Sequence, residues 1–269
     1  MKNIILFILT IFIFASCEDL SGPGAFSDQF VLQGYLISQR PIDSLILRRT
    51  APIDVFYTDE AYSINNATIK IIEGNKIIEL KNDPRRHGYY FNADTNYKII
   101  SNKKYEIQIS VDGKQISGST IVPETLSFTQ KFPSPMIYKN GLLQLKWTRS
   151  KNYLDYIISI KSLDTTDAFL IPKDFNRPNS AEVKKPEPTN FIFNLFGKNE
   201  FNIPWFFFNY YGRQVVSILA VDENYKNYLM QLNSGGTDLK EISYKLNGAI
   251  GVFGSAAIDT FSVNLLKEN

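Results

Sequence analysis

Two stretches of alternating apolar and polar residues, each interrupted by a two-residue turn, limit the possible fold more than any other feature of the sequence. Residues 67–80 alternate on both sides of Gly-Asn at 74–75, and residues 104–121 alternate on both sides of Asp-Gly at 112–113. Alternation with a period of two buries one face of a β-strand, and such dipeptides are typical of β-hairpin turns. We therefore expect both stretches to form hairpins.

Further segments rich in β-branched and aromatic residues extend this pattern along the chain. They cover residues 30–37, 43–49, 142–147, 153–162, 215–221 and 261–265. Because they recur at short spacing without a long segment of helical period between them, we predict an all-β fold of two β-sandwich modules, immunoglobulin- or fibronectin III-like. The first module spans residues 29–123, and the second spans residues 124–269.

The second module has several expected features of its own. Trp147 ends a strand and should be buried, residues 261–265 should form an edge strand, and residues 224–232 place Tyr and Leu at helical spacing. The pattern therefore predicts one short helix. An insertion at residues 164–190 contains four prolines and is too long for a simple turn. It is either disordered or a loop that contacts a partner.

The N-terminus has the proportions of a secretory signal. Lys2 precedes an apolar run, residues 4–15, which is broken only by Thr10 and is followed by Ser16. A helix of about 12 residues rises about 18 Å, which is short of the about 30 Å needed to cross the hydrocarbon core of a bilayer. We therefore predict that residues 1–16 are a signal peptide.

Cys17 follows this run directly and is the only cysteine among the 269 residues. No intrachain disulfide can form. A cysteine behind two small residues is the position at which bacterial lipoproteins receive a diacylglyceryl group, so we predict a lipoprotein signal peptide and a lipid on Cys17. Several acyl chains on one residue suffice for stable anchoring. The alternative is an ordinary signal peptide followed by an incidental cysteine.

Residues 17–28 are interpreted as a tether. Glu18 and Asp19 follow the cysteine, and residues 22–24 read Gly-Pro-Gly, which is typical of a short flexible spacer. In Bacteroidota, acidic residues behind the lipidated cysteine resemble a signal for display on the outer face of the outer membrane. The predicted localisation is therefore the cell outer membrane, lipid-anchored and surface-exposed; a solvated acidic start of a tether is the plainer alternative.

The charged and ionisable residues argue against several classes of function. Lys and Arg number 29 against 27 Asp and Glu, for a net charge of +2, so no nucleic-acid partner is expected. His87 is the only histidine, which leaves a Ser-His-Asp triad or a zinc site without support. Residues 222–224, Asp-Glu-Asn, are a fragment of a calcium cluster and are better explained as an acidic cap at the end of a strand. We expect no catalytic, metal or cofactor-binding residues, although a carboxylate pair formed in space, as in a glycosidase, stays open.

The run at residues 205–211, Trp-Phe-Phe-Phe-Asn-Tyr-Tyr, is the most distinctive interior segment. Alternate members of a strand point to opposite faces, so at least three of these aromatic rings face away from one core. The run is core if both faces are covered. If one face is open, Trp205, Phe207, Tyr210 and Tyr211 form a candidate surface for a sugar ring or a protein partner.

Seven short motifs resemble one known family. They lie at residues 33–35, 49–52, 66–68, 120–123, 212–218, 223–229 and 247–254. Together they are similar to an uncharacterised lipoprotein family of Bacteroidota (domain of unknown function forty-two forty-nine) over nearly the whole chain after Cys17. The resemblance implies an envelope lipoprotein, often encoded beside TonB-dependent outer-membrane receptors, with no established activity and no catalytic residues.

The leading hypothesis is therefore a non-enzymatic surface lipoprotein that is an accessory or binding partner of a TonB-dependent receptor in nutrient capture. The alternative is a stand-alone carbohydrate- or peptide-binding adhesin. A hydrolase with an unrecognised carboxylate site is the third hypothesis.

Overall fold

The computed structural model describes residues 26–137, 141–163, 191–195, 197–204, 207–208, 211–233 and 245–266. In these ranges the chain is mostly β, with two helices, α2 (Asp59–Tyr62) and α3 (Glu223–Asn233). Neither helix has the length and apolar character needed to cross a membrane. The predicted signal peptide, Cys17 and the insertion at residues 164–190 lie outside the described residues.

Each predicted segment contains a strand, and five further short strands in the described residues were not predicted. The bounds of the strands, in chain order, are β1 (Phe30–Ile37), β2 (Leu45–Arg49), β3 (Thr68–Glu73), β4 (Lys76–Asn82), β5 (Tyr89–Phe91), β6 (Lys104–Val111), β7 (Lys114–Ile121), β8 (Met136–Ile137), β9 (Leu142–Lys146), β10 (Asp155–Ser162), β11 (Phe191–Asn194), β12 (Glu200–Pro204), β13 (Gly212–Val221), β14 (Leu246–Asn247) and β15 (Ile250–Leu266).

Both predicted hairpins are confirmed. β3 pairs with β4 across residues 74–75, and β6 pairs with β7 across residues 112–113. Asp112 and Gly113 have φ values of 49° and 73°, and a type I′ turn requires positive φ at both of its central residues. The predicted short helix is confirmed as α3.

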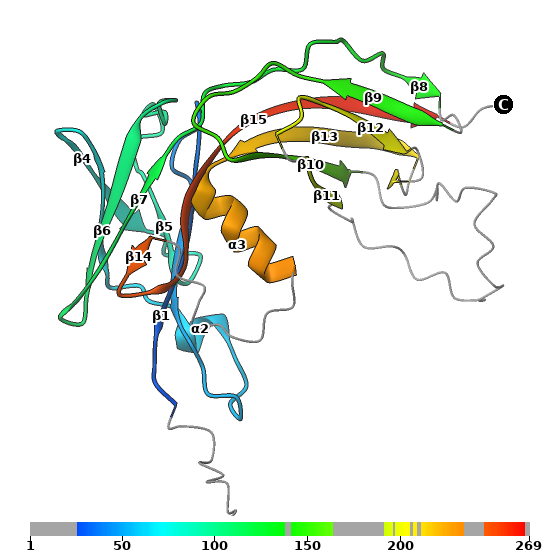
Figure 1. Ribbon diagram of the computed structural model, residues 1–269. Helices are drawn as coiled ribbons and strands as arrows, with labels where there is room; N and C mark the ends of the chain where they lie inside the picture. Colours follow the sequence, from blue (N-terminus) through cyan, green and yellow to red (C-terminus); the bar gives the residue numbers. More distant parts are fainter. Residues whose placement is uncertain are drawn as a thin grey trace, which may run out of the picture.

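The strands form one large curled, mixed sheet instead of two separate sandwiches. Its order is β11-β10-β13-β15-β1-β2-β5-β4-β3-β6-β7-β14, with β8 beside β15, and only β9 and β12 pair apart from it (Figure 1). The predicted β-rich fold is confirmed, but the strands do not form two clearly separate sandwich modules. The hydrogen-bonded path passes from one half of the molecule to the other through β15.

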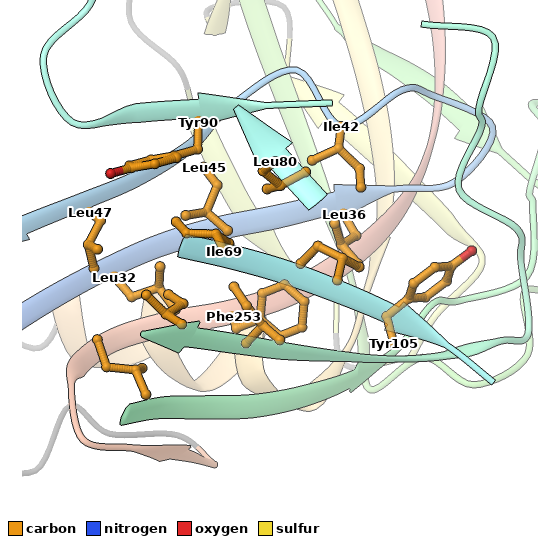
Figure 2. Close-up of a cluster of buried hydrophobic side chains, with 14 of the residues drawn as sticks. Leu32, Leu36, Ile42, Leu45, Leu47, Ile69, Leu80, Tyr90, Tyr105 and Phe253 are labelled. Carbon is orange, nitrogen blue, oxygen red and sulfur yellow. The ribbon is translucent and has the colours of Figure 1, made fainter. Parts of the chain in front are cut away.

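The first half of the sheet curls around its own hydrophobic core. Starting from β15, the pairing runs through β1 and on to β7 and β14, and β14 ends only two residues before β15 begins. Alternate residues of β1 are buried, which places Leu32 and Leu36 inside this curl. Figure 2 shows Phe253 of β15 beside these two leucines and Leu45. The first core is therefore completed by a residue from near the end of the chain.

The second half has two layers. The short β9–β12 sheet lies over the part of the large sheet formed by β10, β13 and the C-terminal half of β15, and a second hydrophobic cluster lies between them. Trp147 belongs to this cluster and is 1% exposed, as the sequence predicted. Its ring meets that of Tyr156 edge to face, with 5.5 Å between the ring centroids.

β15 joins the two halves. Residues 250–256 pair with β1 in parallel, and residues 256–265 pair with β13 in antiparallel, so Ala256 has one partner in each half, Ile37 and Val221. At residues 261–264 β15 pairs only with β13, as expected of an edge strand, and β8 joins on the other side from Leu265. The strand is longer than expected, at 17 residues. Its first half reads Ile-Gly-Val-Phe-Gly-Ser-Ala-Ala, and its small residues gave no strand signal in the sequence.

Small residues are needed at this crossing because backbones approach closely there. A Cβ atom on Gly251 would lie 2.1 Å from the Leu32 carbonyl oxygen, and the φ of Gly251 is +105°. A Cβ atom on Gly254 would lie 3.0 Å from the backbone nitrogen of Tyr225 in α3. The glycines of β15 thus permit the contacts of this strand with β1 and α3.

Replacing Gly251 with alanine should lower the free energy of unfolding by more than about 3 kcal/mol or prevent folding, because it adds both backbone strain and a steric clash. Gly74→Ala is the matched control: its φ is also positive, at +56°, but no atom lies within 4 Å of the added carbon. The control should cost only about 1–2 kcal/mol. Urea denaturation followed by circular dichroism measures both, and equal losses would contradict the close approach of β15 to β1.

Candidate functional site

A hollow of about 290 Å³ lies between the first half of the sheet and the corner that leads into α3. Its walls come from the start of β6, the end of β7, the segment before β10, and residues 222–224. We call it the junction hollow. With Lys245 at the rim, residues from five separate parts of the chain meet there, so only the folded sheet assembles it.

Asp222 is the buried carboxylate of this region, with an exposed fraction of 6%. Its Oδ1 accepts hydrogen bonds from the backbone nitrogens of Tyr225 (2.9 Å) and Ser255 (3.1 Å). Its Oδ2 accepts a hydrogen bond from the Thr120 hydroxyl at 2.6 Å. The bond from Tyr225 is that of a helix N-cap, and the negative charge lies at the positive end of the α3 dipole. The acidic group predicted at the end of a strand does follow β13, but Asp222 caps the start of α3.

Neighbouring side chains extend this network to the two strands beneath α3. The hydroxyl oxygens of Thr120 and Ser255 are 2.6 Å apart, and Ser255 also donates to the carbonyl oxygen of Ile121. Asn224 donates from one amide nitrogen to the carbonyl oxygens of Ser119 (2.8 Å) and Phe253 (2.9 Å). The network fastens the start of α3 to β7 and β15.

Burial raises the pKa of Asp222 above its ordinary value of 3.8, while the hydrogen bonds from Thr120 and from backbone N–H groups partly oppose the shift. Both carboxylate oxygens accept hydrogen bonds from protein groups. This arrangement explains Asp222 as a structural anchor of the junction, since its hydrogen-bonding capacity is already used within the fold.

The rim of the junction hollow is polar and carries both signs of charge. Lys245 forms an ion pair with Glu223, and the Asn152 amide donates to the Asn102 side chain at 2.8 Å. Tyr153 offers an aromatic side chain and stacks on Tyr156 with 4.3 Å between ring centroids. Chemically, the hollow offers an ammonium group, a carboxylate, an amide and an aromatic ring, which together suit a small polar ligand.

A buried ion pair holds α3 against the second half of the sheet. Asp155 of β10 is fully buried, and its Oδ2 lies 2.9 Å from the Lys226 ammonium nitrogen. The Oδ1 of Asp155 accepts hydrogen bonds from the backbone nitrogens of Tyr156 and Gly197. α3 is thus attached on one side through Asp222 and on the other through Lys226.

The aromatic run singled out in the sequence is described only in part. Phe207 and Tyr211 are half-buried and pack against the second hydrophobic cluster, and Phe208 between them is fully buried. Trp205 and Tyr210 lie outside the described residues, as does Cys17. The candidate binding surface of four aromatic residues is therefore described only at Phe207 and Tyr211.

His87 is exposed in a turn. Within the described ranges no group of three or more His, Cys, Asp or Glu side chains is placed to hold a metal ion. The sequence did not single out the junction hollow. The one available signal was an Asp directly before a helical pattern, which indicates an N-cap but gives no sign that β7 and β15 meet it.

The architecture is that of a mostly β protein in which one long strand joins two cores. The chain belongs to the family described as "Domain of unknown function (DUF4249)", which matches residues 19–262. The comparison with curated proteins gives no match.

Among solved structures, the chain is similar to the fibronectin(III)-like modules of Clostridium thermocellum CbhA. The sequence identity is 10% and the TM-score is 0.27, with 90% of this chain and 95% of that chain covered. It is also similar to the FN1-FN3 domains of chicken CNTN1, with 10% identity and a TM-score of 0.28, covering 71% of this chain and 60% of that one.

The raised pKa of Asp222 predicts how stability depends on pH. Because the native state holds the proton more tightly than the unfolded state, the contribution of Asp222 is greatest below pH 3.8 and is lost as the pH rises through the native pKa. Asp222→Asn removes this titration and keeps an acceptor for Tyr225 and Ser255. Urea denaturation at a series of pH values should therefore show wild type losing stability relative to Asp222→Asn as the pH rises above 3.8.

Asp222→Ala is the control for the hydrogen bonds. It removes the helix cap and the acceptor for Thr120, and should cost about 1–3 kcal/mol more than the asparagine variant. A constant difference between wild type and Asp222→Asn at every pH would contradict the shifted pKa.

Proposed function

We propose that this chain is an outer-membrane lipoprotein, anchored by lipid on Cys17 and displayed at the cell surface, and that it serves without catalysis as an accessory of a TonB-dependent receptor in nutrient capture. Support comes first from the N-terminal sequence, in which a short apolar run and two small residues precede the single cysteine. The family match begins at residue 19, two positions after Cys17.

The observation that carries the proposal is the place where the tether meets the folded chain. Residues 26–29 are exposed and lead into β1 at one end of the molecule, whereas the second half of the sheet, with β8 and the ends of β9 and β15, lies at the other end (Figure 1). A lipid on Cys17 would thus attach the protein by one end. The junction hollow and the second half would stay accessible to a partner.

The far end offers an apolar surface for such a partner. Ile137 and Leu266 pair in register on β8 and β15 and are 47% and 42% exposed, and Leu142 at the start of β9 is 61% exposed. Exposed apolar residues grouped at strand ends are typical of protein-contact surfaces. We name these three residues the far apolar tip and assign it to the receptor contact.

A second candidate function, a stand-alone carbohydrate- or peptide-binding adhesin, is favoured by the junction hollow. Its volume of about 290 Å³ is at the lower end of the range for small-ligand sites, and its rim combines Tyr153 with amide and charged groups. A glycan-binding measurement on the purified chain separates the two functions, since an accessory protein needs its receptor and an adhesin does not.

Cys17→Ala should abolish metabolic labelling of the protein by fatty acid, because lipidation begins at a cysteine thiol and the sequence has no other cysteine. In intact cells, added protease should degrade the labelled wild-type protein if the protein faces outward. A chain that is labelled but protected from protease would retain the anchor and refute surface display.

Leu142→Glu should lower recovery of a TonB-dependent receptor with the lipoprotein from solubilised envelopes by about tenfold or more, because a charge would enter an apolar contact. Ile77→Glu on β4 is the matched control, since Ile77 is 62% exposed and lies in the other half of the sheet. The control should leave recovery unchanged. Recovery of no receptor with the wild type would count against the accessory function, and equal effects of both variants would count against the far apolar tip.

A further inference from the structure

The segment between β2 and α2 presents apolar side chains to water. In residues 51–57, Ile53 is fully exposed and Phe56 is 88% exposed, and Val55 and Tyr57 are 45% and 40% exposed. We call this segment the apolar loop. A group of exposed apolar side chains of this size marks a surface that is covered in the working protein.

The apolar loop is fixed in place at both of its ends. The backbone nitrogen of Val55 donates to the carbonyl oxygen of Pro52, which closes a turn with Ile53 at its tip. At the end of the loop, Tyr57 stacks on Tyr62 with 5.2 Å between ring centroids, and Thr58 directly after it caps α2. The fold therefore holds Ile53 and Phe56 outward instead of letting them pack on the core.

The loop begins beside the exit of the tether. The backbone nitrogen of Thr50 donates to the carbonyl oxygen of Gln29 at 2.9 Å, and that of Gln29 donates to the Thr50 hydroxyl at 3.0 Å. An ion pair between Arg49 and Asp28 strengthens this attachment. Figure 1 shows α2 and its neighbouring loop beside the start of β1, at the end where the N-terminal chain leaves.

The tether is short compared with the size of the protein. Eight residues, 18–25, separate Cys17 from Phe26. Fully extended, they span at most about 30 Å, and less when flexible. A lipid on Cys17 would therefore hold this end of the molecule, and the apolar loop with it, close to the membrane.

The charges around the loop are largely paired. Arg48 forms an ion pair with Asp59 at 3.0 Å, and Arg49 is shared between Asp28 and Asp112. Asp54 adds a further acidic side chain within the loop. Attraction to anionic headgroups is thus weak, and contact with a lipid surface would depend on apolar burial.

We propose that the apolar loop inserts Ile53 and Phe56 into the interface of the membrane that holds the Cys17 lipid. The proposal rests on the lipid anchor of the proposed function. The lipid fixes one point of attachment, and side chains of this kind enter the boundary between headgroups and acyl chains. A second point of contact sets the orientation of the protein, with α2 toward the membrane and the second half of the sheet away from it.

The test uses the single cysteine. In the lipidated full-length chain the Cys17 thiol is blocked, so Ile53→Cys supplies the only free thiol for an environment-sensitive dye. The labelled lipoprotein is reconstituted into vesicles of phosphatidylethanolamine and phosphatidylglycerol that contain lipids with a quencher on the acyl chain. The emission should shift to shorter wavelength and be quenched, and 1 M NaCl should not reverse either effect because the contact is apolar. Ile77→Cys, on β4, is the matched control, and a dye attached there should keep the emission that it has in water and should not be quenched.

A second measurement tests the loop without the anchor. For the unlipidated Cys17→Ala chain, adding Ile53→Ser and Phe56→Ser should lower the vesicle partition constant by about tenfold for each side chain removed. Adding Ile77→Ser should not change it.

The outcomes separate this proposal from the proposed function. Absence of fatty-acid labelling on the wild type refutes the anchor, and the partition experiment then tests the loop alone. If the protein carries fatty acid and binds vesicles, but the emission of the dye at position 53 remains that of a dye in water, the contact of the loop with lipid is refuted and the anchor is retained. A dye that becomes shielded only when a purified receptor is added also overturns the lipid contact, since the loop would then be a receptor contact.

Discussion

The close passage of β15 between the two cores is the constraint on which the rest of the structure depends. Its first half pairs with β1 and contributes Phe253 to the first core, and its second half pairs with β13 and contributes Val263 to the second. Glycine at position 251 allows the β1 backbone to come near, where any side chain would collide with the Leu32 carbonyl. The two cores are therefore joined by one continuous strand, and a change at the crossing affects both.

The buried polar groups near this crossing follow from the same geometry. β7, β15 and the start of α3 meet there, and their polar backbone groups need partners away from water. Asp222 accepts from two backbone nitrogens and one hydroxyl, and Asn224 donates to two carbonyl oxygens. Burial removes water from the Asp222 carboxylate, which disfavours its charged form and raises its pKa. The hydrogen bonds that it accepts, and its position at the N-cap of α3, offset part of this desolvation cost. The junction is therefore ordered by polar contacts as well as by apolar packing.

The two ends of the molecule differ in what they offer to other molecules. The end beside the tether carries the apolar loop, which is fixed by contacts of Thr50 with Gln29. The other end carries Ile137, Leu142 and Leu266 on strand ends. An attached protein with contact surfaces at opposite ends is suited to joining a membrane to a partner, which is the arrangement that the proposed accessory function requires.

The sequence by itself determined the elements with strong local signals. The hairpins at residues 67–80 and 104–121, the helix after Asp222 and the burial of Trp147 follow from alternation, turn residues and helical spacing, which act between near neighbours. The sequence also confined any lipid anchor to Cys17, because it contains no other cysteine. Only the tertiary structure decided the role of residues 250–257, whose glycines and alanines have low strand propensity and form the first half of a long strand because β1 and α3 approach them closely. The junction hollow and the exposure of Ile53 and Phe56 were decided in the same way, since both depend on contacts between residues far apart in the chain.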